Sequence, residues 1–275
     1  MSSIAFRILR TYSWFLAMLL MSPLAIIMIV SLTNDGSIRF PPQNFGFRWI
    51  LTAFTERSFV QAFTFSVVIA AIVSMTATLL AMSTAVALTR FEFGGKGFVQ
   101  AYVMAPLLLP HLVIAIGLIQ LFSVLKWTTS PEGLIAGHVV CVFPLVLRLC
   151  LVSLAETDPM AEKAAYSLGA SRFYVFRRIT IPQVASAAVS GSLIAFLLSF
   201  DESVIAIFTS TPGRTTLPVM IFNYVEQRSD PLIAAVSSIM IGFAIILIIL
   251  ADRSVGVLQL LSGGQIGARG EPSGN

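Results

Sequence analysis

The sequence contains little charge. Asp, Glu, Lys and Arg make up 11% of its 275 residues, whereas 57% are hydrophobic and the mean hydropathy is +0.91. Soluble domains carry about 25% charged residues, so this chain lacks the polar surface that would keep it in water. The composition excludes a soluble protein and indicates an integral membrane protein. The net charge of +4 does not indicate nucleic-acid binding, because the cations are scattered through short loops and form no basic face.

Cysteine is also scarce. Cys141 and Cys150 are the only two, and both lie inside one apolar run, which favours a packing role over a disulfide or a metal site. A cleavable signal peptide is not evident. The first apolar run, from Trp14 to Leu32, is long enough to span a membrane and has no A-x-A-like exit.

Several functional motifs are missing. There is no G-x-x-x-x-G-K-[ST] loop, because GGKGF at 94–98 lacks both the spacing and the hydroxyl residue. An intramembrane enzyme is not supported either, since there is no H-E-x-x-H and no second aspartate in a Gly-x-Gly-Asp setting. We therefore expect no catalytic residue, no metal site and no cofactor on this chain. A secondary transporter usually has more spans with internal repeats, and no repeat of 20–50 residues is found here, so it remains the less favoured alternative.

Apolar runs long enough to cross a bilayer, about 20 residues each, occur six times. They cover 14–32, 59–88, 99–125, 134–155, 184–208 and 232–250. Residues 259–275 are typical of a disordered tail. The sequence predicts an all-α integral membrane protein with six transmembrane helices within residues 1–258. If the N-terminus is inside, more of the loop Lys and Arg residues also lie inside, which favours two cytoplasmic termini.

The same orientation places residues 156–183, between the fourth and fifth spans, in the cytoplasm. Asp158 and Pro159 are typical of a helix start, and Gly169 is typical of a helix end. A second short helix follows, and Ile181-Pro182 is expected to close the unit before the fifth span. This pattern predicts a helix, a glycine break, a second helix and a proline.

Ala-Ala-x-x-x-Gly followed by Ile-x-Ile-Pro resembles the EAA loop of ABC importer permeases. In that family the loop forms a coupling helix that fits a groove on the cytoplasmic ATPase. One position departs from the family pattern, because Lys163 stands where the family usually has Glu and Glu162 comes one residue earlier. A one-residue offset turns a side chain by about 100° on a helix, so which of the two contacts the ATPase stays open. The resemblance implies these coupling residues: Glu162, Lys163, Ala164, Ala165, Gly169, Ala170, Arg172 and Pro182.

The resemblance extends over residues 10–258, and SFDESVIAIFTSTPGRTTLPVMIF at 199–222 is similar to the spermidine/putrescine branch. It implies the type I ABC importer permease fold in a bacterial inner membrane. It also implies three kinds of partner: a second homologous permease, two ATPases that bind ATP and Mg, and a periplasmic solute-binding protein. The implied solute is polyamine-like or another small cation. An opine, an amino-acid derivative and an aminophosphonate stay open.

Two carboxylates, Asp201 and Glu202, interrupt the fifth span. An ionised carboxylate in lipid costs a few kcal/mol, and adjacent side chains point about 100° apart on a helix. We therefore expect Asp201 to face the solute pathway and Glu202 to face a neighbouring helix, although the reverse assignment is open. An ion pair with Arg148 is not expected, because their depths differ by about 15 Å.

Two histidines complete the expected solute pathway. His138 lies at the same depth as Asp201 and is the better-placed neighbour for it. His111 follows Pro110 near mid-membrane, and it either lines the pathway or bonds to a carbonyl that the proline frees. Arg148 is expected to extend to the cytoplasmic interface.

Overall fold

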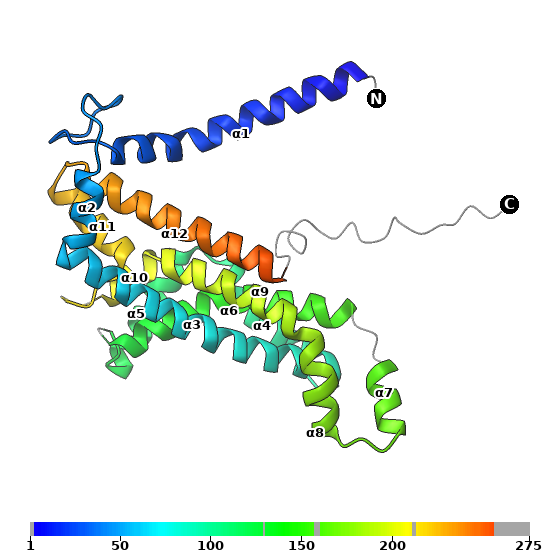
Figure 1. Cartoon of the computed structure of the whole chain (residues 1–275). Coiled ribbons are helices and arrows are strands. Elements are labelled where there is room, and N and C mark those ends of the chain that lie inside the picture. Colours follow the sequence, from blue (N-terminus) through cyan, green and yellow to red (C-terminus); the bar gives the residue numbers. More distant parts are fainter. Residues whose placement is uncertain (1–2, 129, 157–159, 211–212, 256–275) are drawn as a thin grey trace. The chain divides into compact units, whose positions relative to one another are not determined.

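The computed structural model describes residues 3–128, 130–156, 160–210 and 213–255, and these are mainly helical, with loops that include a β-bridge between Thr33 and Phe45 (Figure 1). The predicted tail and the capping pair Asp158 and Pro159 lie outside the described residues. The elements are α1 (Ser3–Ser31), α2 (Arg48–Thr55), α3 (Arg57–Arg90), α4 (Lys96–Met104), η1 (Ala105–Leu108), α5 (His111–Leu125), α6 (Pro131–Glu156), α7 (Met160–Ser167), α8 (Arg172–Val175), η2 (Phe176–Thr180), α9 (Ile181–Asp201), α10 (Val204–Thr209), α11 (Leu217–Gln227) and α12 (Leu232–Val255).

By length and composition, four of the described helices can cross a membrane. They are Phe6–Ser31, Arg57–Arg90, Pro131–Ala155 and Leu232–Leu250. Two bent helix pairs bring the number to six if each pair counts as one span. These are Lys96–Leu108 with His111–Leu125, and Arg172–Ala185 with Ala187–Asp201. The bent pairs correspond to the third and fifth predicted spans.

The third predicted span is not a continuous helix, since the two halves meet at an angle of 112°. Pro110 lacks an N–H group and disfavours helical geometry in the residue before it. Leu109 is accordingly extended, with φ −100° and ψ 141°. Pro144 shares this chemistry but lies inside the continuous helix α6. The bend therefore depends on local packing as well as on the proline.

The fifth predicted span is also interrupted. Helix α9 ends at Asp201, Glu202 is extended with ψ 113°, and α10 starts at Val204. The segment also begins earlier than predicted, because η2, a π-helical turn, leads directly into α9. Pro182 therefore does not close the preceding unit. It lies in the first turn of α9.

The chain forms two compact units, residues 1–63 with 219–244 and residues 64–218 with 245–275. In the first unit, Asp35 organises the loop after α1. Its carboxylate accepts hydrogen bonds from the backbone N–H of Gln43 at 2.9 Å and from the side chain of Asn44 at 2.8 Å. Hydrogen bonding from Asn44, together with that from Gln43, lowers the pKa of Asp35. Trp49 donates its indole N–H to the Asp35 carbonyl at 2.8 Å, which ties the loop to α2.

The second unit is built on close helix packing. Small residues of α3, including Ala70, Ala77 and Ala81, are fully buried, and small side chains allow helices to approach closely. Helix α6 packs along α9. A Cβ added at Gly191 of α9 would lie 2.9 Å from a methyl carbon of Val146, so this contact requires glycine. This packing fixes the ends of α6 and α9, where the two groups of predicted functional residues lie.

Candidate functional site

The first group of predicted functional residues lies mostly on α7, α8 and the turn between them, at one end of the second unit (Figure 1). Helix α7 ends in a Schellman motif, with hydrogen bonds from Gly169 N to Tyr166 O and from Ala170 N to Ala165 O, both 3.0 Å. Gly169 has φ +83°, and Ser171 caps α8 by accepting a hydrogen bond from Tyr174 N. The predicted glycine break between two helices is confirmed, although α8 has only four residues.

Glu162 faces the interior of the unit. It is 7% exposed, and its Oε1 accepts hydrogen bonds from Arg90 Nε at 3.1 Å and from Thr180 Oγ1 at 3.0 Å. Arg90 is the last residue of α3, and Thr180 ends η2 just before α9. One carboxylate oxygen therefore joins α7 to α3 and to the turn that leads into α9. We call Glu162, Arg90 and Thr180 the latch.

The other predicted coupling residues lie mostly on the surface. Ala165 and Ala170 are half-buried, and the exposed members are Lys163, Ala164, Gly169, Arg172 and Pro182. Large apolar side chains accompany them, since Leu168 is 88% exposed and Phe173 is 70% exposed. These two residues and Arg90 are not among the coupling residues predicted from the sequence. Ala161, Ala164, Ala165 and Leu168 follow the spacing of one helix face, which is a signal for Leu168, but nothing in the sequence signals Arg90.

The second group lies at the break between α9 and α10. Glu202 Oε1 accepts hydrogen bonds from the backbone N–H groups of Val204 at 2.8 Å and Ile205 at 3.2 Å, so it caps α10. Its other oxygen, Oε2, lies 3.1 Å from Nδ1 of His111, the first residue of α5. The Glu202 side chain is 9% exposed and that of His111 is 55% exposed. Both oxygens of Glu202 are therefore used within the chain.

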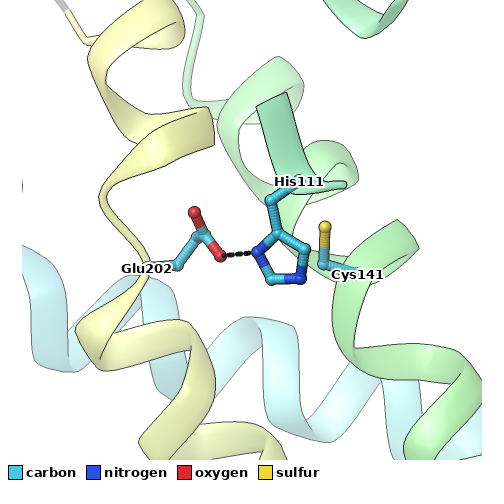
Figure 2. Close-up of side chains that lie close together, drawn as sticks. All are labelled: His111, Cys141 and Glu202. Carbon is cyan, nitrogen blue, oxygen red and sulfur yellow. Dashed lines mark ion pairs between the residues drawn. The ribbon is translucent and has the colours of Figure 1, made fainter. Parts of the chain in front are cut away.

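Asp201 differs from its neighbour. It is exposed and is the last residue of α9, and the structure gives it no ion pair within the described part of the chain. Cys141 lies near the paired His111 and Glu202 (Figure 2). The structure therefore brings together His111 and Glu202 of the predicted pathway residues and leaves the Asp201 carboxylate open.

His138 is placed differently from the prediction. It is fully buried in α6, and its Nδ1 lies 2.9 Å from Ser199 Oγ. It therefore bonds to a residue of α9 that precedes Asp201 by two positions, and not to Asp201 itself. Arg148 is exposed on α6, and no ion pair joins it to Asp201 among the described residues.

Comparison with known proteins gives a family match. A family model described as "Binding-protein-dependent transport system inner membrane component" matches residues 77–260, more than half of the chain. The spermidine/putrescine transport system permease protein PotC of Escherichia coli is 30% identical over 224 residues, covering 82% of this chain and 85% of that protein. The putrescine transport system permease protein PotI of Escherichia coli is 34% identical over 203 residues, covering 71% of this chain and 72% of that protein.

Solved structures show the same fold. A chain of a bacterial ABC transporter involved in the import of the acidic polysaccharide alginate superposes with a TM-score of 0.69, covering 92% of this chain and 94% of that one, at 15% identity. A chain from an inward-facing MetNI methionine ABC transporter gives a TM-score of 0.62, covering 72% of this chain and 95% of that one, at 14% identity. At this identity the likeness concerns the fold alone. It confirms the predicted all-α permease fold of ABC importers.

Proposed function

The chain belongs to the binding-protein-dependent transport system inner membrane component family, and from this premise we propose that it forms part of the pathway for a small cationic, amino-containing solute. As a family member it is a non-catalytic, multi-pass permease of an ABC importer in the inner membrane. ATP binds the ATPase partners, and a periplasmic binding protein belongs to the complex. Membership in this family excludes the alternative that the chain is a secondary transporter. We further propose that a second homologous permease completes the pathway and that both termini are cytoplasmic.

The open carboxylate of Asp201 is the observation that carries the solute proposal. A charge within a membrane span needs a partner or a wet cavity, and Asp201 has no ion pair within the described chain. The carbonyl end of α9 adds partial negative charge at the same point, while the Glu202 charge is already held by the α10 N-terminus and His111. An ammonium group suits this environment, and a carboxylate or phosphate does not.

The relatives support the same solute class. The names of PotC and PotI assign them spermidine and putrescine, which are polyamines. The amino group is also the feature that opines, other amino-acid derivatives and aminophosphonates share with polyamines. Asp201 therefore supports the amine as the recognised group, and the polyamine is our choice within that class.

The experiment for this proposal is uptake into proteoliposomes that contain the assembled transporter, its binding protein and ATP. We expect saturable uptake of a diamine, and competition by other amines of similar length. The matched controls are a diol and a dicarboxylate with the same carbon chain, which we expect not to compete. Direct binding of the same compounds to the permease pair alone separates its selectivity from that of the binding protein. Equal binding of the diol and the diamine would contradict the proposal.

We propose that the exposed face of α7 and α8 docks on the ATPase. Lys163 and Arg172 supply positive charge there, and Leu168 and Phe173 supply apolar surface. Because Glu162 is engaged in the latch, Lys163 is the better candidate for the ATPase contact. In this scheme the latch carries the movement of α7 to α3 and α9.

Gly169→Val is expected to uncouple ATP hydrolysis from uptake while membrane insertion stays intact. A Cβ added at Gly169 would have no atom within 4 Å, so a larger side chain would not clash there. Glycine is favoured instead by the backbone, because its φ of +83° is a conformation that other residues rarely adopt. A branched residue in that conformation costs about 1–3 kcal/mol, which favours a shifted α7–α8 angle. Uptake per ATP hydrolysed is the measurement. Gly169→Asn should retain most coupling, because Asn tolerates this conformation, and equal behaviour of the two variants would argue against the two-helix geometry.

A further inference from the structure

The His111, Cys141 and Glu202 side chains converge from three separate elements of the second unit. His111 begins α5, Cys141 lies in α6, and Glu202 lies between α9 and α10. One ligand atom from each, a ring nitrogen, the thiol sulfur and a carboxylate oxygen, lies within 4.8 Å of the other two. In Figure 2 the Glu202 carboxylate and the Cys141 sulfur lie on either side of the His111 ring. We infer that these three residues bind a transition-metal ion of the Zn²⁺ type.

The donor set selects the kind of metal. Nitrogen and sulfur donors suit zinc and similar ions, whereas Ca²⁺ and Mg²⁺ prefer oxygen ligands. A thiolate and a carboxylate carry two negative charges, so with a neutral imidazole they balance a divalent ion. A neutral site matters in a membrane protein, where net charge is costly.

The geometry needs only small changes to close around an ion. With metal–ligand bonds of about 2.0–2.3 Å, tetrahedral ligand atoms lie roughly 3–4 Å apart, and His111 Nδ1 and Glu202 Oε2 are already 3.1 Å apart. The other Glu202 oxygen is held by the N–H groups of Val204 and Ile205, which orients the carboxylate. Because His111 is 55% exposed, an ion can enter from the surface and keep a fourth position for water.

Ion binding would join α5, α6 and the α9–α10 break through one centre. If these elements move relative to one another during transport, a bound Zn²⁺ ion holds them together and inhibits uptake. This assigns Cys141 a ligand role in place of the packing role that the sequence favoured. Cys150 is fully buried and keeps that packing role.

The test uses the purified full-length chain without a polyhistidine tag, titrated with Zn²⁺ in competition with a chromophoric chelator. The sequence has only two cysteines and two histidines, so background binding is low. We expect one Zn²⁺ per chain. Cys141→Ser should weaken the Kd by at least about 100-fold, above the range of about 10- to 100-fold caused by changes around a metal site. Cys150→Ser is the matched control, on the same helix, and should leave the Kd unchanged.

A Co²⁺ titration provides a readout that does not depend on transport. We expect a thiolate-to-Co²⁺ charge-transfer absorption in the wild type and in Cys150→Ser, and its loss in Cys141→Ser. Uptake in the presence of Zn²⁺ should fall in the wild type and persist in Cys141→Ser. Zn²⁺ binding unaffected by Cys141→Ser, or a Co²⁺ spectrum without thiolate absorption, would overturn the inference. These results leave the solute proposal untouched, since they do not involve Asp201.

Discussion

Asp201→Asn is expected to raise the KM for the solute by about 10- to 100-fold. The substitution keeps size and polarity but removes the charge at the carbonyl end of α9. A hydrogen bond between charged groups contributes about 1.5–3 kcal/mol, and each 1.4 kcal/mol is tenfold in affinity. The measurement is amine uptake at several solute concentrations, with the amount of assembled transporter quantified in parallel.

Two variants make this result specific. Asp201→Glu retains the charge and should recover part of the affinity. Glu202→Gln removes the same charge one residue further on, but that carboxylate caps α10 and pairs with His111. We therefore expect it to lower thermal stability more than solute affinity. Unchanged KM and uptake in Asp201→Asn would show that Asp201 has no role in the pathway. Loss of assembly in that variant would instead identify an ion pair with another subunit.

Breaking the latch is expected to reduce uptake at least tenfold while the ATPase subunits continue to hydrolyse ATP. Arg90→Ala would leave the Glu162 carboxylate in a largely buried position without its cation, and an unsatisfied buried group costs about 1–3 kcal/mol. The arginine side chain is 19% exposed, so solvent offsets part of this cost. Without the ion pair, Glu162 would keep its hydrogen bond to Thr180, and α7 would lose the ion pair that joins it to α3.

A double-mutant cycle tests whether the two residues act together. If they do, Arg90→Ala combined with Glu162→Ala should be no worse than the more damaging single variant. The matched control is the Lys96–Glu92 ion pair, which has a similar distance of 3.0 Å but an 89% exposed glutamate. Solvent-exposed ion pairs contribute little to stability, so Lys96→Ala should leave uptake unchanged. Additive losses in the cycle, or normal uptake in Arg90→Ala, would argue against the latch.

Features that depend on residues close together in the sequence could be predicted. The apolar runs predicted the membrane-spanning helices, because crossing a bilayer requires about 20 residues. The helix break at Gly169 could also be predicted, since the left-handed position after a helix favours glycine. The family resemblance rested on the same segment and was confirmed by the family match.

Features that depend on packing could not be read in this way. Arg90 and Glu162 are 72 residues apart, and their contact depends on how α3 and α7 turn toward each other. The same holds for His111 and Glu202, which are 91 residues apart and pair where α9 ends at Asp201. Pro110 and Pro144 show the limit most directly. Each removes an N–H group, yet the helix is interrupted at Pro110 and continues through Pro144.

The direct junction between η2 and α9 connects Thr180 of the latch to Asp201 through a helix that bends by 53° between Ala185 and Ala187. The part beyond the bend, Ala187–Asp201, spans about 22 Å at 1.5 Å per residue. Rotation of this part by about 5° at the bend would displace Asp201 by roughly 2 Å on this length. If Asp201 holds an ammonium group, as we propose, a displacement of that size is enough to break a hydrogen bond to its carboxylate.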